Sequence, residues 1–134
     1  MRAAPFFGGA TALCALAAVI VACTPRPSAQ AGHTLYEDYC AACHGPGGQD
    51  GAHPDAPDLT RLSARNDGEF PTGLLLARLE GYGQGLHEIA ASDMPRYALL
   101  MDGRLTRVDL PDGRHTQVPV KVVAINRYLE SIQR

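Results

Sequence analysis

The residues best suited to chemistry are two cysteines and a histidine in the pentapeptide Cys40-Ala41-Ala42-Cys43-His44. Two cysteines three positions apart, with a histidine directly after the second, are typical of a c-type haem attachment site. Each thiol can form a thioether to one vinyl group of the same porphyrin, and this spacing places both sulfurs on one side of a single helical turn. The adjacent histidine can then offer a ring nitrogen to the iron. The motif predicts one covalently held haem, with His44 as an axial ligand.

Two other uses of such a cysteine pair stay open at this point. A redox-active dithiol would need a thioredoxin-like βαβ context, and the sequence has no such pattern. Half of a zinc site would need a second Cys/His pair at zinc spacing, and none follows. Haem attachment needs only the pentapeptide itself, so it is the favoured interpretation.

Length and composition favour one small globular domain behind an apolar leader. The chain has 134 residues, of which 46% are hydrophobic and 19% charged, and its formal net charge is −2. Of the 12 basic residues only Lys121 is a lysine, and the arginines are dispersed. Nucleic acid is therefore not an expected partner. Because no cysteine follows Cys43, the sequence does not point to a disulfide framework.

The first 22 residues have the features of a signal peptide. A short basic start precedes an apolar run over residues 10–22, which is short for a membrane span. The run ends Ile20-Val21-Ala22-Cys23, which resembles a bacterial lipobox. The resemblance implies cleavage before Cys23 and diacylation of that residue.

Other fates of this segment stay open. Cleavage after Ala29 or Ala31 would release a soluble product, and an uncut segment that recruits Phe6 and Phe7 would remain as a membrane anchor. As a third alternative, Cys23 could be an incidental small apolar residue. Every version places the rest of the chain outside the cytoplasm, on the periplasmic side of a bacterial membrane.

The segment 23–31 is rich in proline and small polar residues, which cannot build a core. It is expected to be a flexible tether. The domain that follows, residues 32–134, is small enough to have a marginal core, and a covalently held haem would supply a large apolar body to fold around.

The pattern around the cysteine motif resembles that of class I cytochromes c. A first helix is expected over residues 32–43, and Gly32 and Tyr36 match the glycine and aromatic that precede the first haem cysteine in that family. The resemblance implies that they meet Ile125 and Tyr128 of the C-terminal helix. It also implies a mainly α fold of three to five helices around the haem.

Two more residues complete the site that the resemblance implies. Met94, followed by a proline and far downstream of the motif, resembles the family's distal ligand. Proline restricts the residue before it to an extended backbone, and a neutral thioether favours reduced iron. Pro57 resembles the proline whose carbonyl accepts a hydrogen bond from the ligand histidine, which would orient the ring and raise its basicity.

Several residues compete with this assignment. Met101 lies in an apolar run and is expected in the core. His33 is too near the first helix to reach the far side of the haem, whereas His53 and His87 lie in loops and remain alternatives to the methionine. These histidines, and His115, are expected to face solvent or to be hydrogen-bonded.

The remaining elements are expected to enclose the site. A helix that opens near Phe70 and ends near Gly81 would line one wall. Residues 104–118 read as a β-hairpin around the turn Pro111-Asp112-Gly113, an addition to a minimal member of the family. This hairpin could shield the haem, offer a docking edge or be a surface decoration. A final helix is expected from Pro119 to about residue 133.

The resemblance implies a one-electron carrier, not an enzyme, that works between extracytoplasmic redox proteins and is held to a membrane by a lipid on Cys23. One alternative is a haem enzyme or a gas- or peroxide-responsive sensor with a labile sixth ligand. Another is a thiol oxidoreductase that uses Cys40 and Cys43 without haem.

Overall fold

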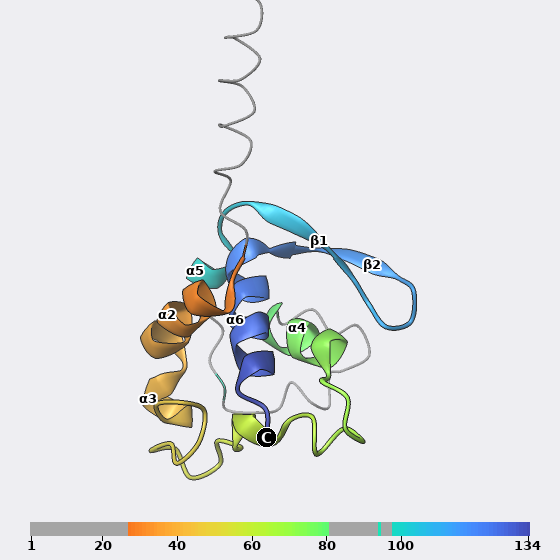
Figure 1. Ribbon diagram of the computed structural model, residues 1–134. Helices are drawn as coiled ribbons and strands as arrows, with labels where there is room; N and C mark the ends of the chain where they lie inside the picture. The colour runs from red at the N-terminus through yellow and green to blue at the C-terminus, as the bar shows by residue number, and fades with distance from the viewer. Residues whose placement is uncertain (1–26, 81–93, 95–97) are drawn as a thin grey trace, which may run out of the picture.

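The computed structural model describes residues 27–80, 94 and 98–134 (Figure 1). This part is mainly α-helical, with a two-stranded antiparallel hairpin before the last helix, as predicted. Within it, no helix is both long and apolar enough to cross a membrane. The elements are α2 (Ala29–Tyr39), α3 (Ala41–His44), the 3-10 helix η1 (Leu59–Arg61), α4 (Thr72–Glu80), α5 (Ala98–Met101), β1 (Leu105–Asp109), β2 (His115–Pro119) and α6 (Val120–Ser131).

The first described helix, α2, begins earlier than the sequence predicted. Its N-cap is Ser28, whose hydroxyl oxygen accepts a hydrogen bond from the Ala31 amide at 3.2 Å, so the helix starts at Ala29 and not at Gly32. The end of the segment expected to be a tether is therefore helical. At its other end α2 stops before Cys40, where the backbone has φ −121° and ψ −36°. The expected single helix is thus two helices that meet at the first cysteine.

The helices α2 and α6 cross in close contact at Gly32. A Cβ on this glycine would lie 1.9 Å from the carbonyl oxygen of Ala124 and 2.9 Å from Cβ of Tyr128. One turn later Tyr36 is fully buried, and its ring centroid lies 5.1 Å from that of Tyr128. The predicted meeting of the first and last helices is confirmed. Ala124 supplies the closest backbone, while Ile125 is fully buried in the core.

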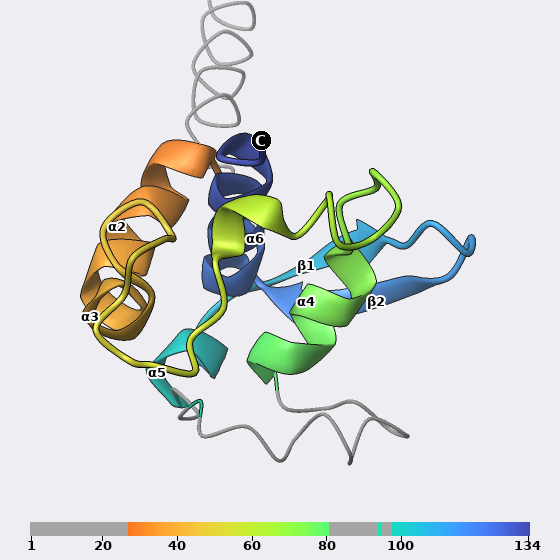
Figure 2. The same ribbon diagram turned by 90° about the horizontal axis from the view of Figure 1, so that it is seen from below.

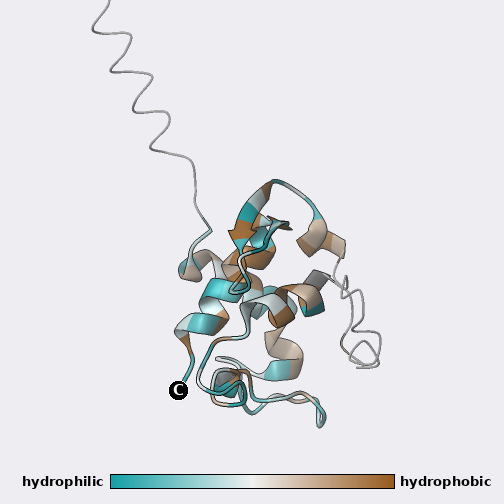
Figure 3. Ribbon diagram, turned by 90° about the vertical axis from the view of Figure 1, so that its right-hand side faces the viewer, coloured by the Kyte–Doolittle hydropathy of each residue, from teal (hydrophilic) through white to brown (hydrophobic). Residues whose placement is uncertain are grey.

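The last helix, α6, is the central element. α2, α4, α5 and β2 all pack on it, and α2 and α4 lie on opposite sides of it (Figures 1 and 2). The buried side chains of α6 include Val122, Ile125 and Leu129, the apolar face expected from the sequence. Figure 3 shows the ribbon of the helices changing between apolar and polar colours, as one buried face per helix requires. The helix begins after Pro119, which is its N-cap and the last residue of β2.

The hairpin has one face in the core. Its two strands pair antiparallel with Thr106 opposite Val118, and Val118 is fully buried. Leu110 reaches α4, where its Cδ2 would lie 3.8 Å from a Cβ on Gly73. Leu105 points the other way and is 53% exposed. The sequence left the role of the hairpin open, and the structure shows that its inner face is part of the domain.

Candidate haem-attachment site

The short helix α3 brings the two cysteines and the histidine onto one turn. The amide of Cys43 donates to the carbonyl oxygen of Cys40 at 3.1 Å, and the amide of His44 donates to the same oxygen at 2.9 Å. Cys40 is buried, whereas Cys43 and His44 are half-buried. Both thiols are free, with no disulfide between them. The fold therefore presents two thiols and an imidazole from one backbone turn.

The environment of the first cysteine bears on the dithiol alternative. Burial raises the pKa of the Cys40 thiol to about 11, with a smaller contribution from Cys43. A redox-active cysteine pair depends on a thiolate that forms near neutral pH. The surroundings of Cys40 oppose a thiolate at this position, so Cys40 is not suited to be the attacking thiol of a redox-active pair.

The imidazole of His44 has a backbone partner on a distant segment. Its Nδ1 lies 3.3 Å from the carbonyl oxygen of Pro57. Because a carbonyl only accepts hydrogen bonds, this contact assigns the proton to Nδ1. The lone pair of a neutral imidazole is then on Nε2, where it can bind a metal.

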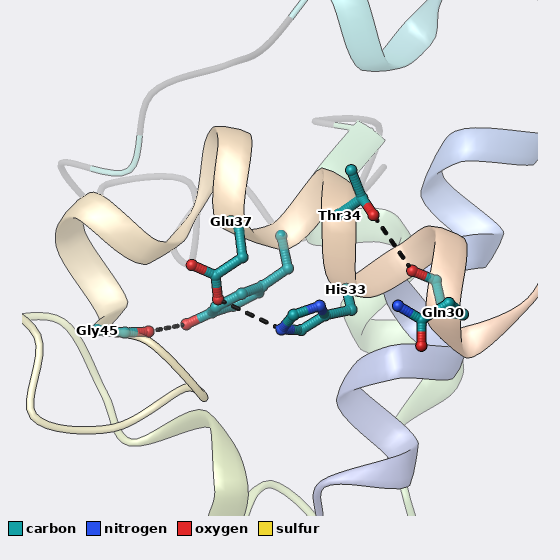
Figure 4. A network of polar contacts seen from close by, with 6 residues as sticks. Gln30, His33, Thr34, Glu37 and Gly45 are labelled. Atoms are coloured by element: carbon teal, nitrogen blue, oxygen red, sulfur yellow. Dashed lines mark hydrogen bonds and ion pairs between the residues drawn. The ribbon is translucent and has the colours of Figure 1, made fainter.

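The loop after the motif is folded tightly against α3, and its glycines make this possible. A Cβ on Gly51 would lie 1.8 Å from the carbonyl oxygen of Cys43 and 2.7 Å from the carbonyl carbon of His44. Gly45 has φ +80°, a conformation that favours glycine. Its carbonyl oxygen accepts a buried hydrogen bond of 2.7 Å from the Tyr36 hydroxyl (Figure 4). The aromatic of α2 thus braces the turn that leaves the motif.

The segment that carries the proline is fixed by its own cap. The carboxylate of Asp58 accepts hydrogen bonds from the Thr60 amide at 2.8 Å and from its hydroxyl at 2.6 Å. These bonds, led by the one from the hydroxyl, lower the pKa of Asp58.

The C-terminus supplies the second support of this segment. Gln133 Nε2 donates to the carbonyl oxygen of Leu59 at 2.8 Å, and Gln133 Oε1 accepts from the amide of Ser63 at 2.9 Å. Sequence reasoning missed Gln133, because a glutamine after the last apolar position of a helix carries no signal of a distant partner.

The residues assigned to the far side of the haem are only partly described. Met94 lies between α4 and α5, outside any regular element, and is half-buried. Its rival Met101 ends α5 and packs against the hydrophobic core, as expected. The predictions for Cys23, for His87 and for Pro95, the proline that follows Met94, fall outside the described residues.

Two of the other histidines have local partners. His33 Nε2 lies 3.6 Å from Glu37 Oε1, and its ring meets Tyr128 edge-on at 5.0 Å (Figure 4). His53 Nδ1 lies 3.3 Å from the amide of Asp55, from which it accepts a hydrogen bond. Across residues 27–80, 94 and 98–134, no three His, Cys, Asp or Glu side chains gather in a group that could hold a metal ion.

The donor set fits a porphyrin. Two thiols on one helical turn match its two vinyl groups, and the adjacent imidazole has its Nδ1 committed to Pro57 and its lone pair on Nε2. A buried arginine atom without a partner, Arg78 Nη1, adds a cation that an anionic group could satisfy. Haem has two vinyl groups for the thiols, an iron for the imidazole lone pair and carboxylates as anionic groups.

Comparison with known proteins agrees with this fit. The family model described as Cytochrome c matches residues 29–112, more than half of the chain. The chain belongs to the cytochrome c family. No curated protein and no solved structure matches it. Membership means a covalently bound haem c with its iron, which confirms the predicted cofactor, and it supports haem-based electron transfer as the general function.

Proposed function

We propose that this protein is a monohaem class I cytochrome c that carries single electrons between extracytoplasmic redox proteins. Its axial ligands are His44 and Met94. The contact of 3.3 Å between His44 Nδ1 and the Pro57 carbonyl oxygen carries the proposal. It holds the imidazole in the tautomer and orientation that a proximal ligand needs, beside two free cysteines on the same turn.

Each residue has a separate task. Haem, when bound, supplies an iron centre that gains and loses one electron. Cys40 and Cys43 fix its position through thioethers, and His44 donates its Nε2 lone pair. Met94 would offer the iron a soft, neutral sulfur as its second protein ligand, which favours the reduced state over a second nitrogen ligand. With His44 and Met94 both bound, the iron would have no free site for a substrate.

Partners of such a carrier bind briefly. A protein that must accept an electron from one partner and deliver it to another needs a small, weak interface with each. The described surface has dispersed charges of both signs, with ion pairs such as Arg107–Asp109 and Arg114–Asp112 on the exposed side of the hairpin. This surface fits transient protein partners.

The optical spectrum of the holoprotein tests the axial assignment. We expect a six-coordinate low-spin haem with an Fe–S charge-transfer band, which Met94→Ala abolishes while lowering the reduction potential. The matched control Met101→Leu removes the other candidate sulfur and keeps the band. A band that survives in Met94→Ala would overturn the assignment. A high-spin resting spectrum in the unaltered protein would favour the enzyme or sensor.

We further propose that the domain is held on the periplasmic side of a bacterial membrane by a lipid on Cys23. The apolar run over residues 10–22 and the residues before Cys23 support this. Because α2 is capped by Ser28, only five peptide units separate the lipid from the helix. Such a segment spans at most about 18 Å, so the domain would stay close to the lipid headgroups.

Cell fractionation tests the anchor. Cys23→Ser should move the haem protein from the membrane to the soluble fraction, whereas Cys14→Ser, within the same apolar run, should leave it in the membrane. If Cys23→Ser remains membrane-bound, an uncut anchor replaces the lipid.

A further inference from the structure

Two of the three large apolar side chains that are exposed in the described part of the chain come from neighbouring segments. Leu99, on α5, is 59% exposed, and Leu105, at the start of β1, is 53% exposed. Both lie beside the start of α6. Lys121 Nζ donates to the carbonyl oxygen of Leu99 at 2.7 Å, and Leu105 lies opposite Pro119, the N-cap of α6. Single exposed leucines are ordinary, whereas this leucine pair indicates a surface with a partner.

The described chain begins at the same end of the domain as the leucine pair. In Figure 1 the first described residues, α5, the start of β1 and the start of α6 all lie at the upper end. Arg127 of α6 donates a hydrogen bond to the carbonyl oxygen of Pro27, which fixes the point where the chain leaves the domain. The proposed lipid on Cys23 is four residues before this proline. The chain between them spans at most about 14 Å, so the lipid would hold this end against a membrane.

The charges of this end are complementary to anionic lipid headgroups. Residues 98–127 contain five arginine or lysine residues and three carboxylates. Two of the cations form ion pairs with two of the carboxylates within the hairpin. The other three cations are Arg104, Lys121 and Arg127, and the other carboxylate is Asp102. Exposed leucines among cations are typical of a surface that lies in the interface of a bilayer.

The opposite end has the reverse charge. Residues 45–69, which include η1, contain five carboxylates and two arginines, and Arg134 adds one cation through its hydrogen bond to Thr60. These residues lie at the lower end in Figure 1, together with α3 and its two cysteines. Anionic headgroups would repel this end. The tether and the charges therefore select the same orientation.

We propose that the end of the domain with Leu99 and Leu105 rests on the membrane surface, with both leucine side chains inserted at the boundary of headgroups and acyl chains. The three cations face anionic phospholipid headgroups. The proposal rests on the lipid at Cys23, which keeps the domain at the surface, and it is independent of the axial ligands. It gives the haem protein one orientation, in which α3 faces the aqueous phase and is open to redox partners.

Alkylation of single cysteines by a charged, membrane-impermeant maleimide tests this orientation. Leu99→Cys and Leu105→Cys are made separately in a Cys14→Ser background, so that each variant keeps one leucine. With haem and lipid attached, the other native cysteines are blocked and the introduced thiol is the reactive one. Ala64→Cys, on the exposed turn after η1, is the matched control. The haem spectrum shows that each variant is folded.

The lipidated holoproteins are compared in vesicles of phosphatidylethanolamine and phosphatidylglycerol. Leu99→Cys and Leu105→Cys should react about tenfold more slowly than Ala64→Cys, because the bilayer covers them. In the unlipidated Cys23→Ser form without vesicles, all three positions should react at similar rates. Vesicles of neutral phosphatidylcholine should protect the leucine positions less, because the cations then lose their anionic partners.

Equal rates at the three positions in the anionic vesicles would overturn the proposal. Slow reaction at the leucine positions already in the soluble form would also overturn it, because protein and not lipid would then cover them. Equal protection by neutral and anionic vesicles would contradict the role of the three cations. Failure of the lipid anchor itself is distinguishable. It appears as membrane-bound Cys23→Ser in cell fractionation and leaves the comparison of positions within the same vesicles valid.

Discussion

The Nδ1 atom of His44 lies 3.3 Å from the carbonyl oxygen of Pro57, thirteen residues further along the chain. The residues after this proline are held in turn by Gln133 and Arg134. Gln133 donates to the Leu59 carbonyl oxygen, and the amide of Arg134 donates to the Thr60 carbonyl oxygen at 3.0 Å. The orientation of the imidazole therefore depends on Gln133 and Arg134, which lie about ninety residues after the cysteine motif in the sequence.

Gln133→Ala should loosen this support. The Ser63 amide donates to Gln133 Oε1 at 2.9 Å, and losing a net stabilisation of about 1 kcal/mol should speed its hydrogen exchange roughly fivefold. Exchange measured by NMR on the holoprotein reads this amide directly. Ser131→Ala is the control, because its hydroxyl bonds only the nearby Tyr128 carbonyl oxygen. Equal Ser63 exchange in both variants would show that the C-terminus does not hold the segment.

Gly32→Ala should strongly destabilise the protein. The new Cβ would lie 1.9 Å from the Ala124 carbonyl oxygen, so α2 and α6 must separate, at a cost of about 3 kcal/mol or more. Gly73→Ala in α4 is the matched control. Its Cβ would meet nothing closer than 3.8 Å, and alanine is the better helix former by about 1 kcal/mol. Denaturant unfolding should therefore move in opposite directions for the two variants, and similar midpoints would contradict the crossing.

Tyr36→Phe should change both stability and its dependence on pH. Near neutral pH the loss of the hydrogen bond to the Gly45 carbonyl oxygen should cost about 1–3 kcal/mol. Burial raises the pKa of Tyr36 above its ordinary value of 10.0. The unfolded chain then ionises first, so this contribution is complete below pH 10 and is lost as the pH rises toward the folded pKa.

Unfolding of the holoprotein at pH 8, 10 and 11 checks the sign. The unaltered protein should lose stability above pH 10 more steeply than Tyr36→Phe. Some slope should persist in the variant, because burial also raises the pKa of Tyr128. Parallel losses in the two proteins would show that Tyr36 titrates alike when folded and unfolded.

Val118→Ala should reveal whether the hairpin belongs to the core. Val118 is fully buried, so the smaller side chain should cost about 1–3 kcal/mol of stability. Leu105→Ala on the same hairpin removes a side chain that is 53% exposed and should stay within about 0.5 kcal/mol. Thermal or chemical unfolding compares the two. A Val118→Ala variant as stable as Leu105→Ala would make the hairpin a surface decoration.

The local chemistry of this protein could be predicted from sequence. The spacing of Cys40, Cys43 and His44 is itself the condition for attachment to one porphyrin. The turn residues Pro111-Asp112-Gly113 predict the hairpin. Helical periodicity predicted the buried face of α6, and Gly32 predicted a close crossing. In each case a few neighbouring residues carry the information.

Other features depend on contacts between distant segments. Gln133 donates a hydrogen bond to Leu59 at the start of η1. The hairpin buries Val118, and Nη1 of Arg78 is buried without a partner. All three features follow from how α4, α6 and the strands pack. The start of α2 was missed for a local reason, because the Ser28 cap lies in a segment whose prolines suggested a tether.

The mass of the intact, denatured protein, purified from the cells that make it, tests the central claim most directly. The account predicts a polypeptide that carries the mass of one haem after denaturation, located by fragmentation to Cys40 and Cys43. A denatured chain without haem, with these two cysteines as free thiols or joined in a disulfide, would contradict it.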